Sequence, residues 1–270
     1  MTSAELYRLI KLPEEMKELY TRWDGELTPQ ADEELTERLL DRTRWDGAVE
    51  ELYERVGEDP DHLKVLWEEL RIGAAQWPKW QKKGIPEEIY RDTMAFGTRY
   101  LYDGKKAYGR WCFTAGWWFQ RHLAMELFRL GSLEYELMNL PEGRRAYIHI
   151  PTDADLSPAA LDDSLRRFRD FAAAFYPEWA KAEIWCDSWL MSPAIRPLLP
   201  EHSRIIGFQD RFDLVSVDAE NMGGVEWVFP GMKDVPREDL PEDTALRRKM
   251  KAFLLAGGRP GWAARRLREG

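Results

Sequence analysis

The sequence predicts a two-domain α/β protein of the α+β kind, with a helical first part and a mixed β-sheet in the second part. Helix-start signals recur through the first hundred residues. After Gly131 the apolar residues alternate as they do in strands, and the segments from Leu133 follow the order β-β-α-β-α-β-β. We place the helical domain at residues 1–110 and the sheet domain at residues 111–270.

The first part contains three helix starts in which a proline follows or replaces a capping residue. Thr28 and Pro29 precede one helix, Asp59 and the next proline precede another, and Pro86 opens a third. Proline suits the first helical turn because its missing N–H would have no partner there. The stretch "GRWCFTAGWWFQRHLAMELFRLGS" is predicted as a further helix that ends near Gly131.

The second part begins with a hairpin. The strands "LEYELMNL" and "RRAYIHIP" flank a Pro-Glu-Gly turn, and an amphipathic helix follows with Ser157 as its N-cap. "AEIWCDSWL" is the next strand and "SPAIRPLLP" a short helix. "RIIGFQDRFDLVSVDAE" is read as one long strand and "GVEWVFPG" as the strand that closes the sheet. A strand–helix–strand unit is parallel, so Ile148 and Ile184 should lie on adjacent parallel strands.

Cysteine use and hydropathy indicate a cytoplasmic protein. Cys112 and Cys186 are far apart and lie in no metal-ligand spacing, which favours a reducing compartment and no metal site. The first twenty residues mix charged and apolar side chains, unlike a signal peptide. No run approaches the roughly 18 apolar residues of a membrane helix, so no membrane association is expected.

The formal charge of −9 is unevenly distributed. Residues 1–95 hold 23 acids and 14 bases, whereas residues 96–270 hold 25 of each. This acidity argues against general nucleic-acid binding. The last 27 residues hold eight bases, including Arg247, Arg248, Arg265 and Arg266. They form either a solvated helix face or a surface for one phosphorylated small molecule.

A set of motifs resembles a known family. "IHIP" followed by a Ser-Pro-capped helix, and then "DSWLMSPAIRPLLPEHSRIIGFQDRF", resembles the GNAT-like C-terminal domain of bacterial acyltransferase-domain proteins. "GIPEEIYRDTM" and "LFRLGSLEYEL" resemble the helical N-terminal N-acyltransferase domain and the junction of the same group. The resemblance runs from about Gly84 to Phe212. It implies an atypical Gcn5-related N-acetyltransferase fold.

The chain departs from the superfamily pattern in three places. The segment after Ile150, "PTDADLSPAALDD", lacks the spaced glycines of the pyrophosphate loop. Asp187 stands where the family commonly has a histidine before Ser-Trp. The tyrosine that often serves as general acid is missing from "SPAIRPLLPEHS".

The resemblance implies acyl transfer from a thioester to an amine, which needs a proton acceptor. His149, Asp187 and Glu134 are the candidates. Each has a structural alternative: a strand histidine bonded to a neighbour, a turn cap, and, with Glu136, a row on the solvated face of a strand. Cys186 and Ser188 lie in no recognisable nucleophile pattern. We expect Asp187 to lie near His149, because neighbouring parallel strands are about 5 Å apart.

The implied cofactor is acetyl-CoA or a longer acyl-CoA. The residues expected to contact it are Ile150, Pro151, Thr152, Ser157, Ser188 and Trp189. A backbone N–H of His149 or Ile150 would stabilise the oxyanion, since Pro151 has none. Four acids (Asp153, Asp155, Asp162 and Asp163) crowd the start of the Ser157 helix, where cofactor phosphates would need to bind.

The leading function from the sequence is therefore an acyl-CoA-dependent N-acyltransferase acting on an unidentified amine. Its partners would be a small-molecule acyl donor and an amine acceptor. The alternative is a non-catalytic GNAT-like module that binds a ligand or a protein. The 13 tryptophans, among them Trp117, Trp118, Trp185 and Trp189, serve either as core filling or as aromatic walls for an acyl chain or a sugar. A tryptophan-lined carbohydrate-binding surface is a third possibility.

Overall fold

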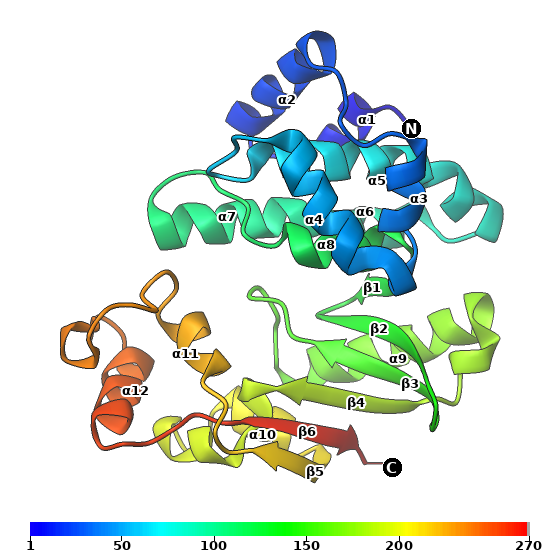
Figure 1. Ribbon diagram of the computed structural model, residues 1–270. Helices are drawn as coiled ribbons and strands as arrows, with labels where there is room; N and C mark the ends of the chain where they lie inside the picture. The colour runs from blue at the N-terminus through cyan, green and yellow to red at the C-terminus, as the bar shows by residue number, and fades with distance from the viewer. Residues whose placement is uncertain (269–270) are drawn as a thin grey trace. The chain divides into compact units, whose positions relative to one another are not determined.

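The computed structural model describes residues 1–268 and divides into two compact units, Met1–Leu130 and Gly131–Gly270 (Figure 1). The first is almost entirely helical, and the second is built on a sheet flanked by helices. This arrangement confirms the predicted fold class. The division falls after Leu130, so the region around Trp117 belongs to the helical unit.

The helical unit contains eight α-helices and ends in a short strand. Its elements are α1 (Ser3–Leu9), α2 (Glu14–Glu26), α3 (Glu33–Leu39), η1 (Arg42–Arg44), α4 (Trp45–Val56), α5 (Leu63–Lys83), α6 (Glu87–Met94), α7 (Phe96–Tyr108), α8 (Gly116–Leu123) and β1 (Leu127–Leu130). The long helix α5 supplies much of the core, including the fully buried Leu66, Leu70 and Trp80. The Trp80 ring packs edge-on against Tyr90 and Phe128.

One helix start follows the sequence, one is shifted and one is wrong. The shifted one is α5, which begins at Leu63 rather than at Pro60, although Asp59 still serves its first turn. The Asp59 carboxylate accepts three backbone N–H bonds, from Leu63, Lys64 and Val65, at 2.9–3.1 Å. Pro86 directly precedes α6. The prediction that Thr28 caps a helix is wrong, because α3 begins four residues later, where the Asp32 carboxylate accepts the N–H of Leu35 at 2.9 Å.

The predicted helix through Gly131 is also only partly correct. Helix α8 ends at Leu123, and Met125 then takes a left-handed backbone with φ of 59°. That turn leads into strand β1, whose N–H at Arg129 donates to the Thr93 hydroxyl at 3.1 Å. The apolar run before Gly131 is therefore a strand.

Up to residue 268, the sheet unit contains five strands and four α-helices. Its elements are β2 (Leu133–Leu140), β3 (Gly143–His149), α9 (Pro158–Phe175), η2 (Pro177–Trp179), β4 (Glu183–Ser188), η3 (Trp189–Met191), η4 (Pro193–Leu198), α10 (Arg204–Gln209), β5 (Phe212–Asp218), α11 (Gly223–Val228), η5 (Arg237–Asp239), α12 (Ala245–Leu255) and β6 (Trp262–Leu267). The six-stranded sheet has the order β1-β2-β3-β4-β6-β5.

The hairpin and the parallel pair form as the sequence predicts. Strands β2 and β3 are antiparallel, and β3 and β4 are parallel, with Ala146 opposite Ile184 and Ile148 opposite Cys186. One face of these strands packs on α9. There the Tyr135 and Phe168 rings stack at 4.5 Å, and the Ser164 hydroxyl accepts the Leu133 N–H at 3.2 Å.

The end of the chain differs from the prediction. The stretch read as one long strand from Arg204 is helix α10 followed by β5, because Ser203 caps a helix there. The closing strand expected at 224–231 is absent, because Gly223–Val228 forms helix α11, whose Val228 packs into a second apolar core with η3, η4 and α12. Strand β6, inside the basic tail, closes the sheet between β4 and β5 instead.

Candidate active site

The parallel strands β3 and β4 part at their carboxyl ends. Their ladder ends at the pair Ile148 and Cys186. Strand β4 nevertheless continues along β6, with Asp187 opposite Ala264 and Ser188 opposite Ala263, while His149 stays paired with Glu134 of β2. Residues 149 and 187 therefore lie outside the β3–β4 ladder. The parting lies at the carboxyl ends of strands, where α/β proteins usually bind their ligands.

His149 is the titratable side chain at this parting. Its Nε2 atom lies 2.8 Å from Oε2 of Glu136 on the neighbouring strand. The carboxylate is 7% exposed and the imidazole 25% exposed, so a buried acid supports a ring that solvent reaches. A carboxylate on one ring nitrogen fixes the tautomer and leaves the other ring nitrogen for a second partner. The arrangement therefore suits a proton acceptor.

Glu134 shares this face of the sheet, since it lies directly opposite His149 in the antiparallel ladder. Glu134 is 4% exposed and Glu136 is 5% exposed. The expectation that the two acids line a solvated strand face is therefore wrong. The alternating pattern of the strand had correctly placed both acids on one face of the sheet. It could not show that this face is buried.

Asp187 does not join the pair. It is exposed and lies one position beyond the last paired residues of β3 and β4, on the same face as Trp185 and His149. No hydrogen bond or ion pair links it to His149 in the described part of the chain. The turn after β4 is capped by Ser188 instead, whose hydroxyl accepts the Leu190 N–H at 3.2 Å.

The other side chains of the "CDSW" stretch have structural roles. Cys186 is fully buried, and desolvation raises the pKa of its thiol, which disfavours a thiolate nucleophile. Trp189 packs in the second apolar core, with Ile195 and Met250 among its members. Of the expected cofactor contacts, Ser188 is thus a turn cap and Trp189 a core residue in this structure.

The remaining expected contacts surround the start of α9. Ile150, Pro151 and Thr152 follow β3, and the Pro151 carbonyl accepts the Ala154 N–H at 3.0 Å in a turn. Ser157 caps α9 by accepting the Ala160 N–H at 3.4 Å, as predicted. The Ser157 N–H and hydroxyl donate to the Asp155 carboxylate at 2.9 and 3.0 Å.

Arginines compensate the acids that crowd this helix start. Arg204 pairs with Asp155 at 2.9 Å, and Arg211 pairs with Asp162 at 2.7 Å. Asp163 is held by two further arginines of α9, Arg166 and Arg167. The local charge is therefore less negative than the sequence suggested, since Arg204 and Arg211 come from α10 and the turn that follows it.

The arginines of the basic tail are engaged within the chain. Arg265 is 8% exposed and donates from Nε to the Met191 carbonyl at 2.8 Å. Arg266 pairs with Glu183 at 3.1 Å, Arg247 with Asp243 at 3.1 Å, and Arg248 donates to the Glu242 carbonyl at 2.8 Å. Whether a phosphorylated ligand competes for them stays a prediction.

Residues 1–268 contain no group of three or more His, Cys, Asp or Glu side chains arranged to hold a metal ion. None of their helices combines the length and apolarity needed to cross a membrane.

Glu136 is the site residue that sequence reasoning passed over as a partner of His149. The signal was present in the hairpin, because counting residues back from the Pro-Glu-Gly turn pairs Tyr147 with Glu136 and His149 with Glu134. No sequence signal predicts the ion pairs of Arg204 and Arg211 with the aspartates of α9, since the approach of these arginines depends on the path of α10.

Two family models cover almost the whole chain. The GNAT-like C-terminal domain matches residues 127–265, and the N-acyltransferase N-terminal domain matches residues 1–125. The first match alone spans more than half of the 270 residues. The chain belongs to the GNAT-like C-terminal domain family. No curated protein matches the sequence.

Solved structures with the same fold include acyltransferases bound to acyl-CoA. An acyltransferase in complex with decanoyl-CoA is 22% identical, with 99% of each chain covered and a TM-score of 0.69. A complex with decanoyl-CoA and teicoplanin is 24% identical, with the same coverage and TM-score. An acyltransferase mutant bound to octanoyl-CoA is 23% identical, with 100% of both chains covered and a TM-score of 0.71. At these identities the likeness establishes the shared two-domain fold.

Proposed function

We propose that the protein is an acyl-CoA-dependent N-acyltransferase. The observation that carries this proposal is the parting of β3 and β4 with the Glu136–His149 pair beside it. An opened parallel pair offers backbone N–H groups to a carbonyl, and the adjacent imidazole offers a proton acceptor. The family match and the acyl-CoA complexes of structures with this fold support the same reaction.

The reaction assigns a role to each group at the parting. The amine nitrogen attacks the thioester carbonyl carbon, a C–N bond forms and the C–S bond breaks. The amine proton passes to the Glu136–His149 pair, and the thiolate of CoA leaves and takes up a proton from solvent. The N–H groups of β3 that follow Ile148 donate to the oxygen of the tetrahedral intermediate. Pro151 cannot donate, so His149 or Ile150 fills this role.

The phosphates of CoA need positive charge to replace the missing glycine loop. Arg204 and Arg211 stand at the start of α9, each paired with an aspartate. Incoming phosphate oxygens would compete with these aspartates for the guanidinium groups, since arginine binds phosphate with two parallel bonds. Arg204, which is 67% exposed, is the better placed to turn toward a ligand.

The acyl chain and the acceptor follow from the relatives with the same fold. Those structures hold octanoyl-CoA or decanoyl-CoA, and one holds teicoplanin. We therefore expect acyl-CoAs of medium length to be donors, with acetyl-CoA as the short reference. For the acceptor we propose a primary amine of a small molecule, without a narrower class.

Calorimetric titration with acetyl-, octanoyl- and decanoyl-CoA tests donor binding. Release of free thiol from the bound donor, with a panel of primary amines, then tests transfer. We expect saturable binding and amine-dependent thiol release that the His149→Gln variant loses. Saturable binding without thiol release for any amine would favour the non-catalytic module. Absence of binding to all three donors would contradict the proposal.

A further inference from the structure

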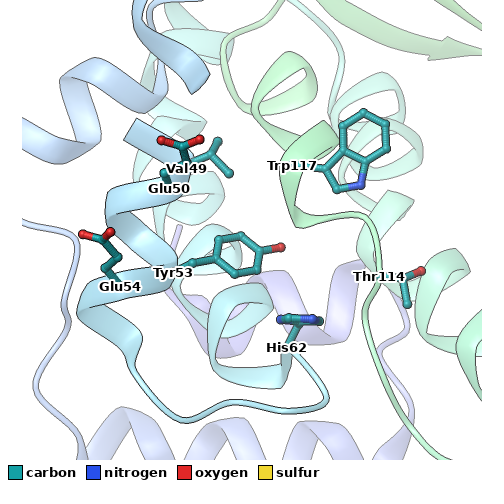
Figure 2. A pocket seen from close by; sticks show the side chains of 7 residues that line it. All are labelled: Val49, Glu50, Tyr53, Glu54, His62, Thr114 and Trp117. Carbon is teal, nitrogen blue, oxygen red and sulfur yellow. The ribbon is translucent and has the colours of Figure 1, made fainter. Parts of the chain in front are cut away.

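A pocket of about 540 Å³ lies within the helical unit, far in sequence from the proposed transfer site. That volume falls within the roughly 300–1,000 Å³ typical of small-molecule sites. Its lining includes Glu50, Tyr53 and Glu54 from α4, His62 before α5, and Trp117 at the start of α8. Figure 2 shows the Tyr53 ring pointing from α4 toward the segment that carries Thr114 and Trp117, with the His62 ring below it in this view.

The charge of this lining is negative. Glu50 and Glu54 are exposed, and neither forms an ion pair within residues 1–268. Glu51, which lies between them on α4, pairs with Arg38 at 2.7 Å and with Arg55 at 2.5 Å. The lining contains no lysine or arginine. An electrostatically matched ligand would therefore be a cation.

The aromatic side chains favour an organic cation. Trp117 is 59% exposed, and no cation of the described chain lies over its ring. Other tryptophans of this unit are already covered: Arg121 lies 3.8 Å from the Trp118 ring, and Arg71 lies 5.0 Å from the Trp67 ring. An exposed indole attracts ammonium groups through its negative face, so the Trp117 ring in the pocket lining can take a cationic ligand.

The Tyr53 and His62 rings line the pocket beside these groups. Their ring centroids are 5.2 Å apart. Burial, with Glu69 and Asp59 nearby, raises the pKa of the Tyr53 hydroxyl well above its ordinary value, so it remains neutral and adds no competing charge. His62 adopts a left-handed backbone with φ of 53°, which is uncommon outside glycine. The Asp59 cap that starts α5 holds this turn.

We propose that the pocket binds an organic ammonium ion that carries an apolar or aromatic group. The ammonium would lie against the Trp117 face, with Glu50 and Glu54 of α4 supplying the negative charge of the lining, and the apolar group would lie along Tyr53 and Val49. This site goes beyond the proposed acyl transfer, because its ligand is held by charge and ring contact and undergoes no reaction. A quaternary ammonium therefore suits it as well as an amine.

Calorimetric titration with benzyltrimethylammonium tests the proposal. This probe has no N–H and cannot be acylated, so its binding is independent of acyl-CoA and of the proposed function. We expect saturable binding that weakens at high salt, since exposed carboxylates contribute. Benzyl alcohol, which is aromatic and neutral, should bind at least about tenfold more weakly.

Three variants locate the binding. Trp117→Ala should weaken it by about tenfold, and Glu50→Gln with Glu54→Gln should weaken it by about fivefold and flatten its salt dependence. The matched control is Glu18→Gln with Glu37→Gln, which removes two exposed carboxylates of α2 and α3 and should leave the affinity unchanged. The proposal is overturned if the wild type shows no saturation up to about 10 mM probe, or if the control weakens binding as much as the pocket variants do.

Discussion

Two buried carboxyl groups, one in each unit, show how differently the protein treats the same chemistry. Glu69 of the helical unit is fully buried, and its Oε1 accepts a bond from Gln120 Nε2 at 2.8 Å. Glu136 of the sheet unit is 5% exposed and meets the His149 imidazole at 2.8 Å. Both are costly to bury in the charged form. They differ in whether the partner can carry the opposite charge.

The partner determines what each carboxyl group can do. Burial raises the pKa of Glu69 well above its ordinary value, and its Oε2 has no hydrogen-bond partner within the described residues. Burial therefore favours the neutral form of Glu69 in the core. Glu136 faces a ring that can take up a proton and share it. Burial of an acid is thus weak evidence for catalysis, and burial beside an imidazole at an open strand end is stronger evidence.

The largest effect should come from removing the imidazole. His149→Gln keeps a hydrogen-bonding side chain opposite Glu136 but removes the proton acceptor, so kcat should fall by about 10²- to 10⁴-fold. Thiol release from acyl-CoA with an amine acceptor measures it. Thermal unfolding is the control, and the midpoint should move by only a few degrees. A variant with full activity would place the base elsewhere.

A smaller loss should follow from neutralising the acid. Glu136→Gln retains an acceptor oxygen for the His149 N–H but removes its negative charge, so kcat should fall by about 10- to 100-fold. The double variant with His149→Gln should be no slower than His149→Gln alone, because the two side chains act as one unit. Additive losses would show that Glu136 acts independently of the ring.

The sequence offered His149 as a candidate but not Glu136 as its contact, and the reason is one of register. A strand pattern shows which residues share a face, while the pairing of two strands depends on the length of the turn between them. His149, Ser157 and Asp59 carry local signals, since strand ends and caps are read from neighbouring residues. The partner of His149 is 13 positions away, and its identity follows only when the hairpin is paired.

Only the last part of the basic tail, strand β6, departs from the expected solvated helix face, for a related physical reason. "WAARRL" contains two arginines and resembles a solvated segment, yet Ala263 and Arg265 are buried in the alternation of β6. Arg265 is tolerated there because its Nε donates to the Met191 carbonyl. The burial of Arg265 depends on this carbonyl partner from η3, and no local sequence pattern predicts that contact.

The contrast between the two acids also predicts a stability effect. Glu69 has a folded pKa above its unfolded value, so its contribution is fully present below about pH 4.5 and is lost as the pH rises toward the folded pKa. Glu69→Gln should therefore raise the unfolding midpoint at pH 8 relative to the wild type, by about 2–4 °C for each kcal/mol gained. The amide can also donate to Gln120 Oε1, which has no partner among residues 1–268.

Melting curves of the wild type and the Glu69→Gln variant between pH 4 and pH 8 measure this effect. The two midpoints should be nearest to each other at low pH and diverge as the pH rises. A constant difference across the range would mean that Glu69 keeps the same protonation state in the folded and unfolded chains.

The smallest effect is expected at Asp187, the acid that the sequence had placed beside His149. Asp187 lies on the same face of the sheet as His149, but it is exposed, and no hydrogen bond joins the two. The field of an exposed carboxylate is screened by water and salt, whereas that of the buried Glu136 is not. Asp187→Asn should therefore change kcat/KM by less than about threefold, a change that shrinks further at high salt. The turn should also stay intact, because Ser188 supplies its cap. Measuring kcat/KM of Asp187→Asn and Glu136→Gln side by side, at low and high salt, separates the two acids. Equal losses would mean that Asp187 closes onto the ring when the donor binds, and that the histidine has a carboxylate on each side during transfer.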